Sequence, residues 1–175
     1  LGLRIIRDSR SDDFVIYNRD EQIELLKSLM KDSARKAQQA VDRISRIKNF
    51  QGDSDAETEK IYEAYQAALK QRNAFDFDDL ICTPIELLQN SDIARTYQDR
   101  FKYIIVDEYQ DINPAQYRLL RLLAGPACDV CAVGDPDQAI YAFRGADLEN
   151  FLNFEKDFPG AGRITLARNY RSTAM

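Results

Sequence analysis

Residues 103–111 have the sequence YIIVDEYQD, in which four apolar residues run directly into two adjacent carboxylates. An uninterrupted apolar run of this kind, rich in β-branched residues, predicts a strand that is buried on both faces. Ligands of open parallel sheets bind beyond the carboxyl ends of the strands. We therefore expect Asp107 and Glu108 at a ligand-binding edge, where one acid can hold Mg²⁺ and its neighbour can orient or deprotonate a water. Alone, the pattern also fits a strand that ends in a solvated acidic turn.

The composition limits the possible functions. The 175 residues are 45% hydrophobic and 30% charged, which is an ordinary globular balance. The net charge of −5 argues against an indiscriminate nucleic-acid coat, so any DNA contact must come from a local patch. No apolar run approaches a membrane span and no signal peptide is recognisable, so we expect a cytoplasmic protein without a membrane partner.

Histidine and cysteine usage excludes further chemistry. The chain has no histidine, which removes every Ser–His and Cys–His catalytic scheme. Its three cysteines are too few for a disulfide framework, and without histidine they make a poor zinc site. We expect all three to be small core residues.

The pattern from residue 20 to residue 100 is largely helical. Amphipathic spacing predicts one long helix over residues 21–47, and Ser54 with Glu57 forms a capping-box pattern for a helix over 55–72. An aromatic–acid alternation, FDFDD at 75–79, leads into a helix that ends near residue 88. Three shorter elements complete this half: an amphipathic helix over 1–7, a strand over 14–17 and a helix over 92–100.

Strands and helices alternate from residue 101 onward. The predicted elements after the first strand are a helix over 114–124, a strand over 129–133, a helix over 147–158 and a strand over 163–167. Strands separated by helices of this length predict a parallel sheet. The polar residues that follow the three strands should therefore meet at one edge of that sheet.

Three polar clusters at consecutive strand ends are far more specific than any one of them. On these residues the sequence resembles the superfamily 1 DNA helicases of the UvrD, Rep and PcrA type. The matching segments are DEYQD at 107–111 (motif II, the Walker B element), VGDPDQAIYAFRGAD at 133–147 (motif III), LARNYRST at 166–173 (motif IV), FDFDDL at 75–80 (the Y-D-F-D-D-L element) and residues 1–8 (the helix after motif Ia).

The resemblance implies roles in ATP hydrolysis for five residues. Asp107 would hold Mg²⁺ and Glu108 would activate the attacking water. Gln138 resembles the glutamine that senses the γ-phosphate, and Arg171 would bring its guanidinium to the phosphates. Tyr170 would stack on the adenine. For Tyr170 and Arg171 a surface turn is the alternative interpretation.

The resemblance also implies a DNA-binding role for motif III. Tyr141 and Phe143 resemble the aromatics that stack on bases of single-stranded DNA, and Arg144 would meet the backbone or brace the loop. The alternative is that one or both rings belong to the core.

The implied fold is α/β: a partial RecA-like P-loop NTPase parallel sheet with a mainly helical inserted subdomain. Residues 1–19 and 75–175 would belong to the RecA-like domain, and 20–74 to the helical insertion. The sequence contains no G-x-x-x-x-G-K-[ST] loop. We therefore expect a fragment whose P-loop and second motor domain lie outside these residues, and which alone does not hydrolyse ATP.

The implied parent is an ATP-dependent DNA helicase of repair or replication, with ATP, Mg²⁺, single-stranded DNA and single-strand/duplex junctions as its ligands. Two alternatives stay open. The motor of an AddA- or RecB-type helicase–nuclease shares these motifs, and a non-catalytic remnant could hold DNA or a protein partner. The intact acidic pair, together with Gln138 and Arg171, weighs against the remnant because pure binding needs none of them.

Overall fold

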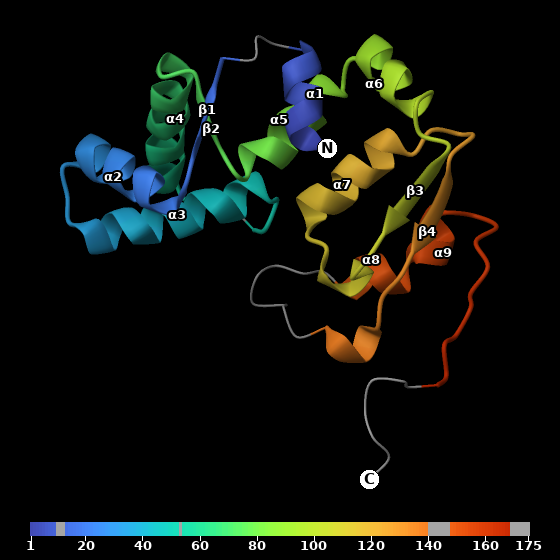
Figure 1. Ribbon diagram of the computed structural model, residues 1–175. Helices are drawn as coiled ribbons and strands as arrows, with labels where there is room; N and C mark the ends of the chain where they lie inside the picture. The colour runs from blue at the N-terminus through green and yellow to red at the C-terminus, as the bar shows by residue number, and fades with distance from the viewer. Residues whose placement is uncertain (10–12, 53, 140–147, 169–175) are drawn as a thin grey trace.

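The computed structural model describes residues 1–9, 13–52, 54–139 and 148–168. Figure 1 shows a helical lobe at one end and a strand lobe at the other. The helical lobe consists of β1 (Val15–Tyr17), α2 (Arg19–Met30), α3 (Ala34–Lys48), α4 (Ala56–Gln71) and β2 (Ala74–Asp76). The other helices of this part of the chain are α1 (Gly2–Ser9), α5 (Asp79–Leu87) and α6 (Ser91–Gln98); α1 and α5 lie between the lobes, and α6 lies beside the strand lobe (Figure 1). The strand lobe consists of β3 (Tyr103–Val106), η1 (Tyr109–Asp111), α7 (Pro114–Leu123), β4 (Asp129–Ala132), η2 (Pro136–Gln138), α8 (Leu148–Leu152) and α9 (Phe154–Asp157).

The helical lobe has its own hydrophobic core. Apolar side chains from α2, α3 and α4 pack together and against β2, which pairs in parallel with β1. The fully or almost fully buried members include Leu26, Ala37, Ile44, Tyr65 and Leu69. Hydrophobic side chains recurring at helical spacing therefore explain why these three helices assemble.

The long helix predicted over residues 21–47 is wrong, because the chain forms two helices there. Lys31 ends α2 in the left-handed conformation with φ 51°. The Asp32 carboxylate accepts the Ser33 backbone N–H at 2.7 Å, and the Ser33 hydroxyl accepts the Lys36 N–H at the start of α3. Short polar side chains compete for backbone groups in this way and favour caps over helix interiors.

Two other helix boundaries differ from the prediction. Asp55, rather than Ser54, caps α4, because its carboxylate accepts the Thr58 N–H at 2.7 Å. The helix predicted over residues 147–158 is divided at Asn153 into α8 and α9. The start of α7 is confirmed, since Asn113 caps it through a capping box and Pro114 occupies its first turn.

The α/β fold class is confirmed, and β3 and β4 are parallel as predicted. The prediction that β3 is buried on both faces is wrong, however. Tyr103 and Ile105 are 71% and 73% exposed, while Ile104 and Val106 pack against the core. The third strand predicted over residues 163–167 is also wrong, because this segment is irregular and Ile164 is exposed. In the described part of the chain each sheet therefore has two strands, and one face of the β3–β4 pair is open.

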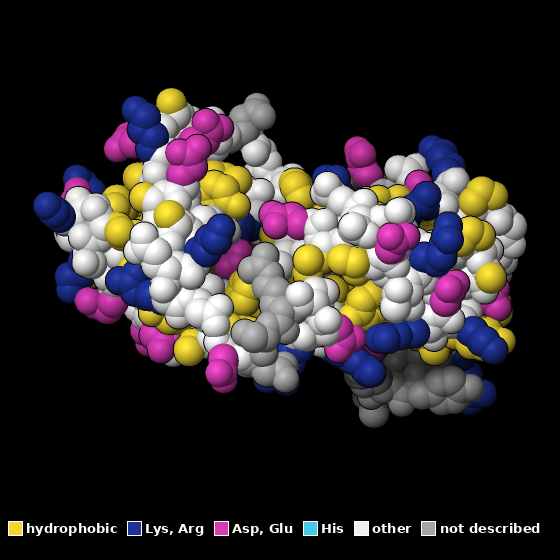
Figure 2. All heavy atoms as spheres, turned by 90° about the horizontal axis from the view of Figure 1, so that it is seen from above, with side chains coloured by type: hydrophobic (Ala, Val, Ile, Leu, Met, Phe, Trp, Pro, Cys, Tyr) yellow, Lys and Arg dark blue, Asp and Glu magenta, His cyan; other side chains and the backbone are white. Residues whose placement is uncertain are grey.

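The surface carries charged side chains of both signs. Figure 2 shows basic and acidic side chains interspersed on the upper face of the molecule. Among the described residues, no helix is both long enough and apolar enough to cross a membrane.

The expectation of three core cysteines is wrong for Cys131, which is exposed. Cys82 and Cys128 are partly buried, and none of the three forms a disulfide.

Candidate active site at the carboxyl ends of β3 and β4

The parallel register of β3 and β4 brings two of the three predicted polar clusters together. Val106 and Ala132 are paired at the ends of the strands. Beyond them the Val133 N–H donates to the Val106 carbonyl at 2.8 Å, and the Tyr109 N–H donates to the Val133 carbonyl at 2.9 Å. The turn that follows β3 is thus fastened to the turn that follows β4, so Asp107 and Glu108 lie at the same edge as the GDPDQ segment.

Asp107 and Glu108 are both exposed at this edge. Glu108 adopts the left-handed conformation with φ 50°, which is uncommon for a residue other than glycine. The Asp107 carboxylate accepts the Glu108 backbone N–H at 2.9 Å. Sparsely populated backbone conformations persist where surrounding contacts hold them, and they cluster at functional sites.

The GDPDQ segment forms the opposite side of the edge. Asp135 accepts the Asp137 N–H at 3.0 Å through Oδ1, an arrangement that begins the short helix η2. The Gln138 amide nitrogen donates to Oδ2 of the same carboxylate at 2.6 Å. Gln138 is exposed and so lies at the surface of the edge, within the turn that is fastened to Glu108.

Gln110 is a residue of this site to which our reading of the sequence assigned no separate role. Its side chain is 1% exposed and lies between the two turns. The amide nitrogen donates to the Glu108 carboxylate at 2.7 Å, and the amide oxygen accepts the Asp135 N–H at 3.1 Å. The only sequence signal was an amide two residues after the acidic pair.

Tyr109 attaches the turn that follows β3 to the hydrophobic core. Its ring is buried and lies edge-on to Phe154, with centroids 5.3 Å apart. Burial raises the pKa of Tyr109 to about 12, so its hydroxyl stays protonated at neutral pH. Tyr109 thus belongs to the hydrophobic support of the site.

The Asp107 and Glu108 carboxylates suit a Mg²⁺ ion that is bound to a nucleotide. Mg²⁺ is usually held by one or two carboxylates, with waters and substrate phosphates as its other ligands. Asp107 and Glu108 offer such oxygens at an exposed edge. Among the described residues, no group of three or more potential metal-ligating side chains occurs, so an all-protein metal cage is not formed by that part of the chain.

The remaining predicted site residues belong to two segments of the sequence, 141–144 and 170–171. Tyr141, Phe143 and Arg144 lie outside the described residues, as do Tyr170 and Arg171. The structure therefore brings together Asp107, Glu108 and Gln138, and leaves the other five assignments as predictions.

The FDFDD segment forms a buried ion cluster with Lys48, a partner that sequence reasoning missed. Lys48 Nζ lies 2.6 Å from Asp76 and 2.7 Å from Asp79. The Tyr65 hydroxyl also donates to Asp76, at 3.0 Å. Burial alone would lower the pKa of Lys48, but the two carboxylates outweigh it and hold that pKa above its usual value. These acids join α3 to the β2–α5 segment.

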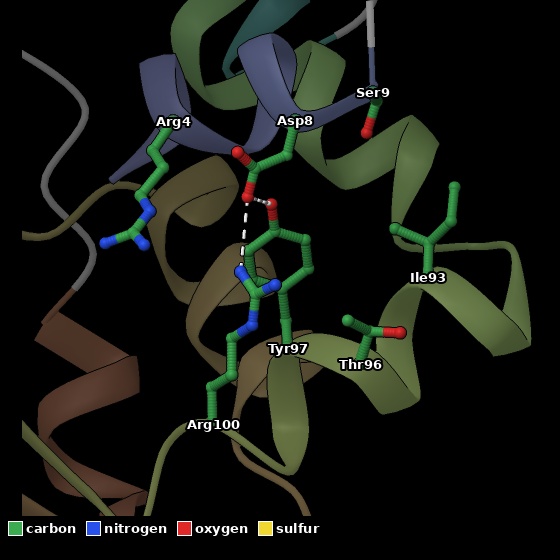
Figure 3. Close-up of a pocket in the computed structure, with 7 residues that line it drawn as sticks. All are labelled: Arg4, Asp8, Ser9, Ile93, Thr96, Tyr97 and Arg100. Carbon is green, nitrogen blue, oxygen red and sulfur yellow. Dashed lines mark hydrogen bonds and ion pairs between the residues drawn. The ribbon is translucent and has the colours of Figure 1, made fainter.

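A separate hollow of about 400 Å³ lies between α1 and α6. Figure 3 shows Asp8 facing Tyr97 and Arg100 across it. The Tyr97 hydroxyl donates to the Asp8 carboxylate at 2.7 Å and Arg100 donates at 3.2 Å; these two hydrogen bonds hold the pKa of Asp8 below its usual value. Because these polar groups satisfy one another, we interpret them as a brace between the two helices.

Comparison with known proteins agrees with the geometry. The model of the UvrD/REP helicase N-terminal domain family matches residues 4–159. The chain is 42% identical to the ATP-dependent DNA helicase PcrA of Staphylococcus aureus, over 92% of this chain and 24% of that protein. It has the same identity to PcrA of Staphylococcus epidermidis, and is 49% identical to YjcD of Bacillus subtilis over 65% of this chain and 15% of that protein. The chain thus spans about a quarter of the length of the PcrA relatives it matches.

Proposed function

The chain belongs to the UvrD/REP helicase N-terminal domain family, and from this premise we propose that it supplies part of the ATP site of an ATP-dependent DNA helicase. The parent would move along single-stranded DNA and unwind duplex at single-strand/duplex junctions. A cytoplasmic motor of DNA repair or replication is the role we favour. The observation that carries the proposal is the exposed Asp107–Glu108 pair, fastened at the ends of two parallel strands to the turn that contains Gln138.

In this proposal the chain contributes the groups that handle the metal and the water. Asp107 would hold Mg²⁺ through its carboxylate, directly or through water, and the bound ion would supply charge neutralisation at the nucleotide phosphates. Glu108 accepts the proton of the attacking water. The Gln138 amide can donate to a phosphate oxygen and accept from that water. Arg171 would face the phosphates and Tyr170 would stack on the adenine.

We propose that the same chain touches DNA through motif III. Tyr141 and Phe143 would stack on bases of single-stranded DNA, and Arg144 would contact the backbone or brace the loop. Stacking tolerates any sequence because every base presents an aromatic face. A motor that steps along DNA needs this tolerance.

We also propose that residues 20–74 are a helical insertion into a RecA-like domain formed from residues 1–19 and 75–175. The separate core of α2, α3 and α4 supports this division.

Unwinding of a partial duplex by the parent protein tests the proposed function. We expect strand displacement that requires ATP, together with ATP hydrolysis that single-stranded DNA stimulates. Glu108→Gln should abolish both activities, whereas Glu63→Gln, the same change at an exposed position of α4, should leave both intact. DNA binding without ATP-dependent displacement by the unmodified parent would instead identify a non-catalytic DNA-binding protein.

A further inference from the structure

We propose that Gln110 is a positioning residue that holds the Glu108 carboxylate in place for water activation and connects it to the turn that carries Gln138. This inference rests on the proposed function, because it concerns the orientation of the group that would accept the proton. Its basis is a continuous series of hydrogen bonds between the two turns.

The series runs through one buried amide. Gln138 donates to the Asp135 carboxylate at 2.6 Å, the Asp135 N–H donates to the Gln110 amide oxygen at 3.1 Å, and the Gln110 amide nitrogen donates to Glu108 at 2.7 Å. Gln110 is the only one of these four side chains that is buried, while Glu108 and Gln138 are exposed. The amide is therefore the fixed part of the series, and the exposed groups at its ends are oriented by it.

The chemistry of the contact requires an amide. A carboxylate can only accept, so the Gln110 atom that faces Glu108 must be the NH₂ group; the Asp135 N–H can only donate, so the atom that faces it must be the oxygen. A glutamate at this position would keep the acceptor for Asp135 but, when ionised, would lose the donor for Glu108. A methionine of similar length would lose both.

Gly134 leaves room for the Gln110 amide because it has no side chain. A Cβ atom at that position would lie 2.5 Å from the Gln110 amide oxygen and 2.9 Å from the Phe151 ring. Contacts of this length are not tolerated, so any larger residue would displace the amide or the ring. The glycine between β4 and Asp135 is thus part of the same arrangement.

The consequence for hydrolysis is that Glu108 does not point freely into solvent. The hydrogen bond fixes one carboxylate oxygen and leaves the other to accept from a water. A movement at Gln138 can also reach Glu108 through Asp135 and Gln110, because each hydrogen bond shares a residue with the next: the carboxylate and backbone N–H of Asp135, and the two ends of the Gln110 amide. The side chain that would sense the phosphate and the group that would activate the water are thereby coupled.

The test measures ATP hydrolysis by the parent protein carrying Gln110→Glu, over a range of pH. At pH 8 we expect kcat to fall about tenfold or more, since a hydrogen bond to a charged group is lost, while the KM for ATP changes less than about twofold. As the pH is lowered toward 6, the new acid can share a proton with Glu108 and donate again, so its activity relative to the unmodified protein should rise. Because protonation also relieves the burial of a charge, thermal unfolding is measured at the same pH values: a recovery of kcat that merely follows the unfolding midpoint would contradict the role of Gln110.

Two companion variants make the result decisive. Gln110→Asn keeps the polarity of the buried site but is too short to reach both partners, so it should lose kcat without recovery at lower pH. Gln89→Glu makes the same chemical change as the main variant at an exposed position and should match the unmodified protein at every pH. Unaltered kcat in Gln110→Glu and Gln110→Asn, or a loss in Gln110→Glu that is the same at every pH, would overturn the inference.

Glu108→Gln, measured in parallel, separates this inference from the proposed function. If Glu108→Gln abolishes hydrolysis while both Gln110 variants behave like the unmodified protein, only the role of Gln110 is wrong. If Glu108→Gln itself hydrolyses ATP normally, the proposed catalytic assignment fails and the role of Gln110 fails with it.

Discussion

One group of acids close together in sequence lies where the helical lobe meets α5, another lies in the strand lobe, and the two groups occupy opposite environments. Asp76 and Asp79 are buried, and Lys48 lies between them with a side chain that is 0% exposed. Asp107 and Glu108 are exposed at the end of a strand, and no ion pair is found for either within the described residues. Buried charges persist when they are paired, whereas unpaired exposed carboxylates remain available to a ligand.

The apolar side chains of the two lobes differ in the same way: they are enclosed in the helical lobe and partly exposed in the strand lobe. Side chains of α2, α3 and α4 enclose one another, so the helical lobe covers its own core. The β3–β4 pair is packed on one face and leaves Tyr103 and Ile105 exposed on the other. The comparison teaches that acids and apolar side chains are enclosed in one lobe and left open to solvent in the other, according to what packs on them.

The largest expected effect is the loss of Lys48. Lys48→Met leaves two carboxylates buried without a cation, which should cost about 3–5 kcal/mol in the stability of the helical lobe. Native-state hydrogen exchange in α3 and α4 of the parent protein measures this. Lys36→Met is the matched control, because Lys36 forms an exposed pair with Asp32 and its removal should change little. Equal effects of the two substitutions would mean that the buried cluster does not stabilise the lobe.

An isoleucine from each lobe tests the difference in apolar covering. Ile44→Ala should cost about 2–5 kcal/mol, because it opens a cavity in an enclosed core. Ile105→Ala should change the unfolding free energy of this 175-residue chain by less than about 0.5 kcal/mol, because the side chain is exposed.

The same isoleucine pair, studied in the parent, shows whether the open face is covered there. We propose that other segments of the parent pack on β3, so Ile105→Ala should then become as costly as Ile44→Ala. Denaturant unfolding of the chain and hydrogen exchange of the parent give the two values. A substitution at Ile105 that is neutral in both settings would contradict the proposed covering.

The smallest expected effect concerns the division of labour within motif III. Tyr141→Ala or Phe143→Ala in the parent should weaken single-stranded DNA binding by about 1–3 kcal/mol per lost stack, with little change in ATP affinity. Gln138→Ala should spare DNA affinity but break its coupling to hydrolysis. A titration of the ATPase rate with DNA distinguishes the variants. Unchanged affinity and stimulation in both aromatic variants would place the rings in the core.

Local patterns predicted the elements whose causes are local. The start of α7 follows from Asn113 and Pro114, and the parallel pairing of β3 and β4 follows from the helix between them. The break at Lys31 was missed, because helical spacing of the apolar residues continues across it. The exposure of Ile105 was missed as well, since an apolar run does not reveal whether a second layer packs on it.

The residues of the candidate site were likewise predictable only where local sequence decides their position. Sequence order alone places Asp107 and Glu108 at the edge that also receives the Gln138 turn. Gln110 and Lys48 were missed for one reason: each has a partner that is distant in sequence. Asp135 lies 25 residues from Gln110, and Asp76 lies 28 residues from Lys48, so only the folded chain shows these contacts.

The most direct test of the account separates nucleotide binding from hydrolysis at the acidic pair of the parent protein. Mg²⁺–ATP affinity and single-turnover hydrolysis should be measured for Glu108→Gln and Asp107→Ala. We expect Glu108→Gln to bind like the unmodified protein and to lose most hydrolysis, because an amide cannot accept the proton of the attacking water. Asp107→Ala should instead weaken Mg²⁺–ATP binding itself. If both variants bind and hydrolyse ATP like the unmodified protein, the acidic pair is structural and the proposed ATP site is wrong.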